Sequence, residues 1–323
     1  MQLDLSKLTS SRNLLAFSAG VDSTALFFLL YENKISFDIA IVNYNLREQS
    51  KEEVDYAKYL ASKYNKNIYL KDVHLKGSNF EKKARDIRYS FFEKIIKENN
   101  YKNLITAHQL NDKLEWFLMQ LSKGAGLVEL LGLQRVQKKQ NYTIIRPLLD
   151  ICKDELENYL KKNNIKYFVD QSNYENKYKR NYFRHKFSNE FLNEFKNGVS
   201  NSFKYLQSDL NSLNIDFEPI FKQKKLYIFK KTNDNNLNIK VIDKHLKKMG
   251  ILISSAQREE ILKQKESVIS NKFSVSLIDD YIWICPYITL PMKKEFKEYC
   301  RKSKIPKLCR SYIGSENIKI DIF

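Results

Sequence analysis

The sequence predicts an α/β protein with a mostly parallel, Rossmann-like sheet, followed by a smaller C-terminal α/β domain. In the first 190 residues, short apolar runs alternate with longer helical segments, which is typical of βαβ units. Beyond residue 190 a polar helical stretch leads to short strand-like runs. A chain of 323 residues can bury two cores. We therefore expect a larger domain over 1–190, a helical linker over 191–213 and a second domain over 214–323.

The elements follow in order along the chain. Apolar runs predict strands in the first domain over 13–17, 36–42, 67–73, 103–106 and 142–145. Helices are predicted between them over 25–30, 50–64, 78–97 and 111–122. Two of these helices open on capping-box signatures, Ser50 with Glu53 and Ser78 with Glu81. In the second domain we expect strands over 225–230, 272–278 and 281–284 and a helix over 257–264.

A loop of small residues joins the first strand to the first helix. It reads Ser18-Ala19-Gly20-Val21-Asp22-Ser23, and it combines a flexible backbone, hydroxyl donors and a helix N-terminus, as a phosphate-binding loop does. It is not a Walker A motif, because no Lys lies between Arg12 and Lys34. An ordinary strand-to-helix turn with serine caps is the alternative.

Charge and cysteine content limit the classes of protein. The net charge of +18 favours an anionic partner, most simply nucleic acid, although a lysine-rich solvated surface would give the same total. The four cysteines form no metal-binding pattern, so we expect buried, inert thiols in a reducing compartment. Neither a signal peptide nor a membrane span is visible in the sequence, and a cytoplasmic protein is expected.

A second polar segment follows the fourth strand. His108, Asp112 and Glu115 are spaced four and three residues apart, so they can share a helical face. The carboxyl ends of parallel strands meet at one edge of the sheet, where this face would meet the loop over 18–23. Two carboxylates and a histidine there could hold Mg²⁺ and take up a proton. A solvated helix start, with acids favoured by the helix dipole, is equally compatible.

Two further segments carry weaker signals. Three of the eight glycines fall within 124–132, which indicates either a loop close to substrate or a helix C-cap at Gly124. Arg180 and Arg184 lie four residues apart and would share a helical face suited to phosphates. An exposed basic turn is the alternative reading.

Taken together, these motifs resemble the tRNA(Ile)-lysidine synthetase family, whose members carry the PP-loop of ATP pyrophosphatases. The resemblance covers residues 11–188, and only 255–258 and the basic character continue it beyond. The motifs occur in the family's order: Ser-Ala-Gly-Val-Asp-Ser, Glu81…Ala84-Arg85…Arg88-Tyr89, Ala107-His108…Asp112…Glu115, Lys123-Gly124-Ala125-Gly126, Arg146-Pro147-Leu148-Leu149, and Asp170-Gln171-Ser172-Asn173…Tyr178-Lys179-Arg180-Asn181…Arg184.

The sequence departs from the family pattern in several places. Ala19 replaces the first glycine of the PP-loop. Asn43 and Tyr44 stand where an Asp and a His are usual, and Gln109 and Asn111 stand where a second His and a first Asp are common. Trp116 replaces a common Thr. The resemblance therefore assigns no role to the missing groups.

The resemblance implies a fold of the PP-loop ATPase type and a two-step ligase reaction. The carbon-2 oxygen of the wobble cytidine in the CAU-anticodon tRNA(Ile) attacks the α-phosphorus of ATP, and pyrophosphate leaves. The ε-amine of free L-lysine then attacks carbon-2, and AMP leaves. The product, lysidine, pairs with A rather than G, so the tRNA decodes AUA.

The same resemblance implies roles for individual residues. ATP would be bound by the loop Ser18, Ala19, Gly20, Val21, Asp22 and Ser23. Mg²⁺ would lie near Asp22 and Asp112, and the proton acceptors would be Asp112, Glu115 and His108. Arg88 and Arg180 would steady the adenylated intermediate. The C-terminal domain would bind tRNA through the basic, aromatic stretches 221–231 and 293–310. The oligomeric state, with a homodimer as one arrangement, and the lysine pocket stay open.

Three other functions fit parts of the sequence. A PP-loop tRNA thiolase would need cysteine pairs, and none is suitably placed. An amidating ligase of the same superfamily would act on a small molecule, and the basic second domain argues against it. A non-catalytic RNA-binding protein with a relic loop would explain the lost Asp and His at Asn43 and Tyr44.

Overall fold

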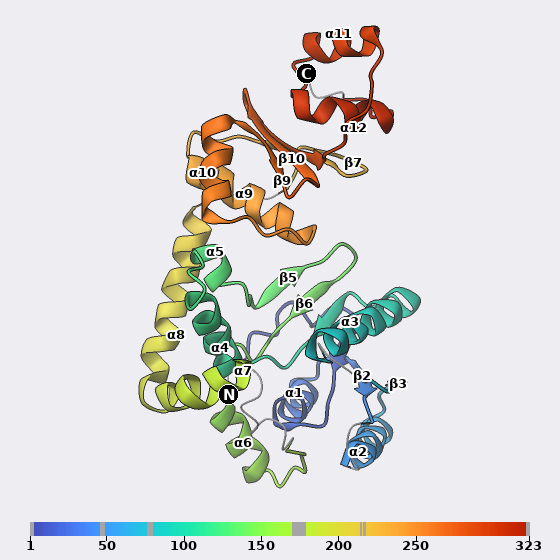
Figure 1. Ribbon diagram of the computed structural model, residues 1–323. Helices are drawn as coiled ribbons and strands as arrows, with labels where there is room; N and C mark the ends of the chain where they lie inside the picture. The colour runs from blue at the N-terminus through green and yellow to red at the C-terminus, as the bar shows by residue number, and fades with distance from the viewer. Residues whose placement is uncertain are drawn as a thin grey trace. The chain divides into compact units, whose positions relative to one another are not determined.

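The computed structural model describes residues 3–45, 49–75, 80–169, 179–213, 215 and 218–320. The chain divides into two units, Met1–Asp209 and Leu210–Phe323, each built on its own sheet (Figure 1). The first unit contains every motif of the predicted phosphate-binding site, so its sheet sets the geometry of that site.

The first sheet has six strands in the order β3-β2-β1-β4-β6-β5. All neighbours pair in parallel except β5, which runs antiparallel to β6. This confirms the predicted mostly parallel α/β sheet. Its strands are β1 (Asn13–Ala16), β2 (Asp38–Asn43), β3 (Ile68–Asp72), β4 (Asn103–Ile105), β5 (Val136–Lys138) and β6 (Thr143–Ile145).

Helices cover both faces of this sheet because the strand side chains alternate between two cores. In β1, Leu15 belongs to a core shared with α1, while its neighbour Leu14 belongs to a second core shared with α3. The helical elements of the unit are α1 (Val21–Glu32), α2 (Gln49–Lys63), α3 (Phe80–Asn99), α4 (Leu110–Leu121), α5 (Leu127–Leu130), α6 (Lys153–Lys162), α7 (Lys179–Phe183), the π-helix η2 (Arg184–Ser188) and α8 (Asn189–Ser212).

The structure differs from the expected elements at several points. Helix α2 begins one residue before Ser50, so Ser50 lies in the first turn instead of at the cap. Ser78, the other expected cap, lies outside the described residues. Strand β5 and helices α5 and α6 were not predicted. The first two are too short to give a clear hydrophobic period, and α6 is strongly polar.

The second unit is a five-stranded antiparallel sheet in the order β7-β8-β11-β10-β9. Side chains on one face pack against α9 and α10, and those on the other against α11 and α12; adjacent residues Ile228 and Phe229 point to opposite faces. The elements are β7 (Phe221–Gln223), β8 (Leu226–Lys230), α9 (Asn235–Lys248), α10 (Ser255–Gln264), β9 (Glu266–Ile269), β10 (Phe273–Ile278), β11 (Tyr281–Pro286), α11 (Lys294–Lys302), the 3₁₀-helix η3 (Lys307–Cys309) and α12 (Arg310–Ser315).

The four cysteines agree with the sequence expectation. Cys152, Cys285, Cys300 and Cys309 are all buried and free of disulfides. In the described part of the chain, we find no helix with the length and apolar character needed to cross a membrane.

Candidate active site

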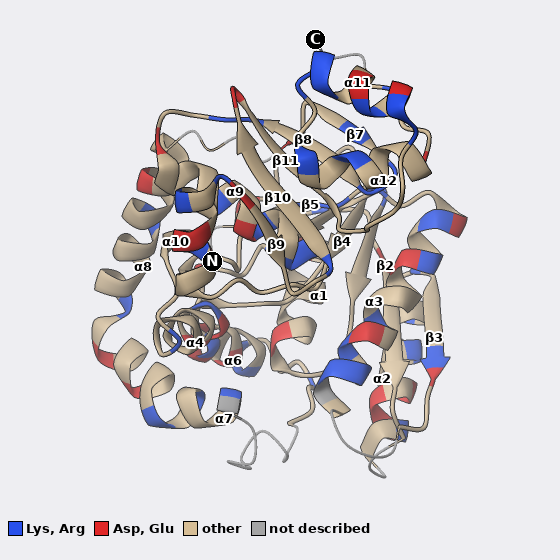
Figure 2. Ribbon diagram, turned by 45° about the horizontal axis from the view of Figure 1, so that its top comes forward, with Lys and Arg blue, Asp and Glu red and all other residues tan. Residues whose placement is uncertain are grey.

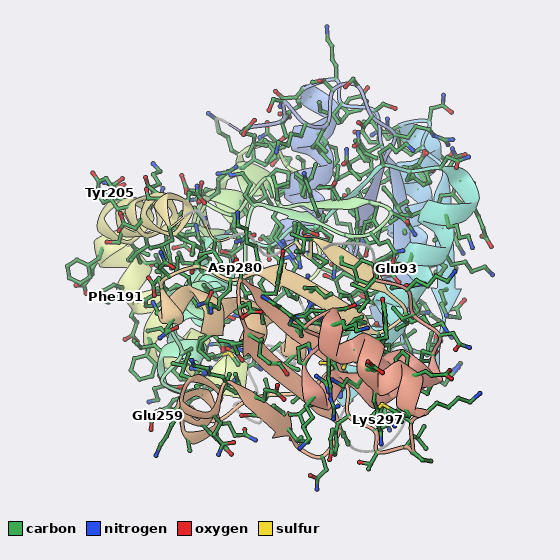
Figure 3. The ribbon with its side chains drawn as sticks, turned by 90° about the horizontal axis from the view of Figure 1, so that it is seen from above. Glu93, Phe191, Tyr205, Glu259, Asp280 and Lys297 are labelled. Atoms are coloured by element: carbon green, nitrogen blue, oxygen red, sulfur yellow. The ribbon has the colours of Figure 1, made fainter. Side chains whose placement is uncertain are left out.

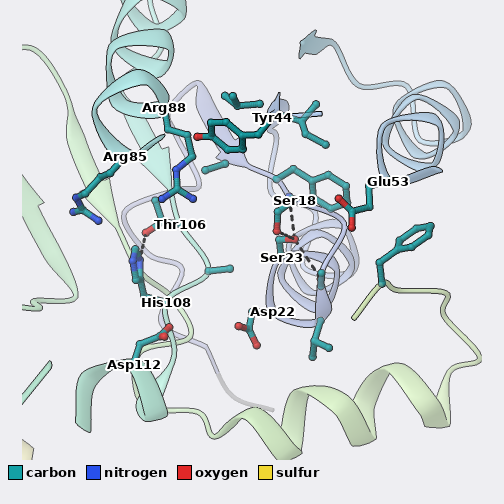
Figure 4. Close-up of a pocket in the computed structure, with 18 of the residues that line it drawn as sticks. Ser18, Asp22, Ser23, Tyr44, Glu53, Arg85, Arg88, Thr106, His108 and Asp112 are labelled. Atoms are coloured by element: carbon teal, nitrogen blue, oxygen red, sulfur yellow. Dashed lines mark hydrogen bonds between the residues drawn. The ribbon is translucent and has the colours of Figure 1, made fainter. Parts of the chain in front are cut away.

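A cavity of about 520 Å³ lies at the carboxyl ends of β1, β2 and β4 (Figure 4). The loop after β1 and the segment after β4 both contribute to its wall, as the topology of a parallel sheet predicts. The described residues that line it include Ser18, Gly20, Val21, Asp22, Ser23, Tyr44, Glu53, Arg85, Arg88, Tyr89, His108, Asp112, Lys153, Arg180, Asn181 and Arg184.

The loop after β1 is held closed by its own serines. The backbone N–H of Ser18 donates to Oγ of Ser23 over 3.2 Å, and the two hydroxyl oxygens lie 3.1 Å apart. The Ser23 hydroxyl also reaches the carbonyl of Gly20 at 3.3 Å. Gly20 is the N-cap of α1, so the first amides of that helix meet the cavity with a partial positive charge. This is the arrangement of an anion-binding loop.

Ala19 takes a backbone conformation that favours glycine. Its φ is 56°, in the left-handed region, and its side chain is fully buried. The amide of Phe168 donates to the Ala19 carbonyl over 2.9 Å and fixes the turn. Gly20, by contrast, has φ of −77°, and a Cβ there would lie 3.6 Å from Oγ of Ser18, an ordinary contact. The glycine-like position of this loop is therefore residue 19.

Asp22 and Asp112 face the cavity with different hydrogen bonding. Among the described residues, nothing hydrogen bonds to the buried Oδ1 of Asp22. Burial, with the negative charge of Asp112, raises the pKa of Asp22 to about 7. Asp112 accepts from the Gln109 amide at 3.1 Å and from Arg180. Burial acts to raise the pKa of Asp112, but Arg180 and its neighbours outweigh it and hold that pKa below the usual range.

This carboxylate pair fits a magnesium ion. An unpartnered, buried carboxylate oxygen beside a second carboxylate is costly unless a cation meets it. The described residues contain no group of three or more metal-binding side chains. Mg²⁺ usually takes only one or two carboxylates and completes its shell with phosphate oxygens and water, so two are sufficient.

His108 lies on the cavity wall just before α4. The Thr106 hydroxyl and the imidazole Nδ1 are 2.9 Å apart. Burial lowers the pKa of His108 to about 4, and the nearby Arg146 and Arg180 add to the effect. The ring is therefore neutral near pH 7 and has a nitrogen that can accept a proton.

Glu115 is placed differently from His108 and Asp112. It is fully buried, and it does not line the cavity. Its carboxylate accepts from Nε of Arg180 at 2.8 Å and from Nε of Arg184 at 2.6 Å. The expectation that all three residues share one cavity-facing side is corrected here: α4 begins after His108, and Glu115 holds the arginines from behind.

Arg180 and Arg184 share a side, as their spacing predicts. Arg180 also pairs with Asp112, so the two arginines join α7 and η2 to α4 through two carboxylates. Both line the cavity, together with Arg88 from α3. The structure thus brings the predicted Arg88 and Arg180 to one site.

Sequence reasoning missed two cations of the cavity. Arg85 lies one turn before Arg88 on α3, where its guanidinium carbon lies over the Tyr89 ring, 4.8 Å from the ring centroid. Lys153 is the first residue of α6 and reaches the cavity beside the loop, which itself has no lysine. Helix α6 was not predicted from the sequence. Lys153 could have been found only from its position after β6, because segments that follow parallel strands lie at the cavity edge of the sheet.

The departures from the family pattern have structural partners. Asn43 donates from its Nδ2 to Asp72 on the neighbouring strand over 2.8 Å, where an Asp would bring two carboxylates together. The Tyr44 hydroxyl donates to the Ala84 carbonyl over 2.7 Å and ties β2 to α3. Gln109 caps α4 by accepting from the Asn111 amide at 2.6 Å.

The glycine-rich segment over 124–132 begins with a glycine, Gly124, at the C-terminal end of α4. Gly124 has φ of 69°, and its amide donates to Leu121 at the end of α4, which supports the C-cap reading. A Cβ on Gly132 would lie 3.0 Å from Nε1 of Trp116, so this glycine makes room for the indole. Residues 170–178, with the Asp-Gln-Ser-Asn motif and Tyr178, lie outside the described part of the chain.

Comparison with known proteins agrees with this geometry. Residues 2–191 match the PP-loop domain family. A tRNA(Ile)-lysidine synthase of Campylobacter jejuni (strain RM1221) is 48% identical over 98% of this chain and 96% of its own length. One from Helicobacter pylori (strain 26695) is 42% identical over 98% and 93%. Among solved structures, the U34-tRNA thiolase NcsA of Methanococcus maripaludis aligns with a TM-score of 0.52 and 18% identity, covering 61% of this chain and 72% of that one.

The thiolase likeness concerns the fold alone, whereas the bacterial relatives match nearly from end to end. Together with the PP-loop match over more than half of the chain, these relatives establish the family. The chain belongs to the tRNA(Ile)-lysidine synthase family of PP-loop enzymes.

Proposed function

We propose that this enzyme joins free L-lysine to carbon-2 of the wobble cytidine in the CAU-anticodon tRNA(Ile), through an adenylated tRNA intermediate. The observation that carries the proposal is the single cavity in which the phosphate-binding loop, two carboxylates and four arginines converge. The names of the near-full-length relatives support tRNA(Ile) as the substrate. The lysidine product would let the tRNA decode AUA.

The loop over 18–23 is suited to the pyrophosphate part of ATP. Amides at the start of α1 and the hydroxyls of Ser18 and Ser23 would meet the charge that builds up as pyrophosphate leaves. Asp22 and Asp112 would hold Mg²⁺, which neutralises phosphate charge when bound. Lys153 would supply the phosphate-binding lysine that the loop lacks.

The arginines are suited to the adenylated intermediate. Arg180 and Arg184 are fixed by Asp112 and Glu115 before substrate arrives, so little side-chain entropy is lost on binding. Arg88 approaches from α3 on another wall of the cavity. Guanidinium groups placed in this way favour a phosphate that gains charge in the transition state.

His108 is the best-placed proton acceptor for the lysine step. The ε-amine of free lysine is protonated at pH 7 and must lose a proton to attack carbon-2. A pKa of about 4 is too low for His108 to deprotonate the free ammonium, but the amine becomes acidic as its bond to carbon-2 forms, and the neutral ring at the cavity wall can accept that second proton. Asp112 is already paired with arginine, and Glu115 lies behind them, so both suit positioning better than proton transfer.

We propose that the C-terminal domain, 214–323, recognises the tRNA outside its anticodon, with 191–213 as linker and 1–190 as the catalytic domain. Methionine tRNA can share the CAU anticodon, so discrimination needs contacts elsewhere. The stretches 221–231 and 293–310 combine lysines and arginines with aromatic rings, and Figure 2 shows Lys and Arg on α11 and α12.

One assay tests the whole proposal. Purified protein is incubated with ATP, Mg²⁺, labelled lysine and unmodified CAU-anticodon tRNA(Ile), with methionine tRNA in parallel. We expect label in tRNA(Ile) only, with release of AMP and pyrophosphate. Pyrophosphate release without label would point to another acceptor, as an amidating ligase requires. Tight tRNA binding with neither product would favour the non-catalytic reading.

Two variants then separate the roles. Asp22→Asn removes the unpartnered carboxylate and should abolish pyrophosphate release at ordinary Mg²⁺ concentrations, while tRNA binding persists. Lys153→Ala should raise the KM for ATP at least about tenfold, since a charge-assisted hydrogen bond contributes roughly 1.5–3 kcal/mol. An unchanged KM for ATP in Lys153→Ala would show that Lys153 does not bind the phosphates.

A further inference from the structure

An aromatic cluster on α7 and η2 lies beside the cavity but takes no part in the chemistry described so far. The rings of Tyr182, Phe183 and Phe187 pack together, with centroids 5.7 to 5.9 Å apart. Tyr182 and Phe187 are each 45% exposed. A cluster of contiguous exposed rings is more informative about binding than apolar residues scattered singly over a surface.

The cluster shares its backbone with the cavity wall. Arg180, Asn181 and Arg184 line the cavity, and the clustered rings at 182, 183 and 187 are interspersed with them along the same segment. An α-helix is only about 10–12 Å wide with its side chains, so one side of this short segment faces the substrate and the other carries the rings. The four ion pairs of Arg180 and Arg184 with Asp112 and Glu115 fix the segment in place.

The π-helix explains how the two sets of side chains coexist. Residues Arg184–Ser188 form η2, a local widening of the helix that is rare and often occurs at functional sites. Its longer turn separates the buried Ser188 and the cavity-lining Arg184 from the exposed Phe187. A regular α-helix would give these side chains a different spacing around the axis.

We propose that Tyr182, Phe183 and Phe187 form a stacking platform for unpaired bases of the RNA loop, next to the nucleotide that enters the cavity. This inference rests on the proposed function. Single-stranded RNA binds proteins by stacking its bases on exposed aromatic rings beside positive charge. The cluster fits, because the exposed Lys186 precedes Phe187 in the sequence and the cavity arginines lie on the same segment.

A second aromatic pair, on α8, has a different charge around it. Phe191 and Phe195 are 49% and 52% exposed, with centroids 5.0 Å apart; Phe191 is labelled beside α8 in Figure 3. Their exposed sequence neighbours Glu190 and Glu194 are acidic and would repel a phosphate backbone. The pair therefore serves as a matched control: similar rings and exposure on the adjoining helix, with the opposite charge around them.

The experiment compares variants of the full chain in binding to the fluorescently labelled anticodon stem-loop of the CAU-anticodon tRNA(Ile). The stacking of one base on an aromatic ring contributes enough binding free energy that loss of one ring weakens binding about tenfold. We expect Tyr182→Ala with Phe187→Ala to weaken binding at least about tenfold without changing its salt dependence. Tyr182→Phe with Phe187→Tyr, and Phe191→Ala with Phe195→Ala, should both bind within about twofold of the parent.

Three outcomes would overturn the platform. The first is parental binding by the Tyr182→Ala, Phe187→Ala variant; the second is an equal loss in the Phe191→Ala, Phe195→Ala control. The third is a change of oligomeric state in the double variant, measured by sedimentation, which would assign the rings to a contact between copies of the chain. If the parent transfers no lysine to tRNA, the proposed function fails separately, and the stem-loop comparison still decides whether the rings bind RNA.

Discussion

Ala19 shows how a single backbone angle governs the phosphate-binding loop. A left-handed conformation costs a residue with a side chain roughly 1–2 kcal/mol, and glycine avoids that cost but loses more entropy on folding. We therefore expect Ala19→Gly to change the free energy of unfolding by less than about 1 kcal/mol, on the stabilising side. Ala19→Val should destabilise by about 2 kcal/mol or more, since a β-branched residue is a severe outlier there and the site is fully buried.

Urea unfolding of the two variants tests this prediction. Gly20→Ala is the control, because its φ of −77° suits any residue and a new Cβ meets nothing closer than 3.6 Å. Equal destabilisation by Ala19→Val and Gly20→Ala would contradict the assigned conformation.

At the residue scale, the sequence predicted which side chains reach the cavity better than it predicted their partners. Ser18, Asp22, His108, Asp112, Arg88 and Arg180 all line the cavity. The burial of Glu115 could not be foreseen, since a spacing of three residues does not tell which side of a helix faces a neighbour. The hydrogen bond of Asn43 to Asp72 joins two strands, so it too depends on the register of the sheet.

At the element scale, four ion pairs join α4 to α7 and η2. Glu115→Gln would remove one of the two carboxylates that Arg180 and Arg184 share. We expect the free energy of unfolding to fall by about 2–4 kcal/mol. The loss stays below the largest values for fully buried pairs because the Arg180 side chain is partly exposed.

A surface pair provides the control for Glu115. Glu157 accepts from Lys153 at 3.5 Å, and both side chains are about a third exposed. Glu157→Gln should change stability by less than about 1 kcal/mol. Guanidinium unfolding measures both variants. If Glu115→Gln lowers the free energy of unfolding no more than Glu157→Gln does, the buried ion pairs stabilise the fold no more than a surface pair.

Helix α9 is joined to its sheet by a histidine that resists protonation. The His245 ring lies 4.0 Å from the Tyr227 ring and 5.1 Å from the Phe229 ring, and within the described chain Nε2 has no hydrogen-bond partner. Burial lowers the pKa of His245 to about 4, aided by Lys248 and Lys222. The pKa of His245 is lower in the folded state than in the unfolded state. Its contribution to the free energy of unfolding is therefore fully present above pH 6.5 and is lost as the pH falls towards 4.

This gives a pH test of the second unit. Between pH 6.5 and 4 we expect the His245 contribution to fall by up to about 3 kcal/mol, following 1.36 kcal/mol for each unit of pKa. His245→Phe keeps a ring between Tyr227 and Phe229 and should remove that part of the acid sensitivity. Thermal unfolding followed by circular dichroism at several pH values measures it, and an unchanged pH profile in His245→Phe would refute the assignment.

Strands with continuous apolar runs were predicted, whereas β5, α5, α6 and, in the second domain, α9, α11 and α12 were not. Strands β1 to β4 and β6, and helices α1 to α4, lie close to their expected positions. Strand β5 has three residues and pairs only as an edge, and α6 has two fully buried side chains. Such elements form because neighbouring structure completes them, and a local pattern does not record that.

At the scale of the whole molecule, the positive charge should determine how tRNA binding responds to salt. Lys294, Lys297 and Arg301 lie on α11 at spacings of three and four residues, and all three are exposed. Changing the three to Ala should weaken tRNA binding and lower the slope of log affinity against log salt by about one for each charge that meets a phosphate. Pyrophosphate release at saturating tRNA should persist.

Replacing the same lysines with Arg is the control, because it keeps the charge. Filter binding at several salt concentrations compares the variants. Loss of ATP chemistry in the Ala variant at saturating tRNA, or an unchanged salt slope, would contradict the role given to the second domain.

The order of the motifs was enough to identify the family, whereas composition alone indicated only an anionic partner. The net charge of +18 states nothing about where the lysines and arginines meet RNA. The cavity, in contrast, follows from a general rule of parallel sheets, which places the ends of β1 and β4 together. Specific chemistry was predictable where topology fixes position, and recognition surfaces were not.

The pairing of Arg180 and Arg184 with Asp112 and Glu115 also sets the order in which the site matures. A ribosome delivers the chain from its N-terminus, so the loop, α1 and both carboxylates emerge well before either arginine. Until the arginines arrive, Glu115 is a carboxylate that α4 can bury only at high cost. A nascent chain that ends before residue 180 thus carries the whole loop over 18–23 but lacks the cavity-wall side chains of Arg180 and Arg184, and we expect it to have no ATP chemistry.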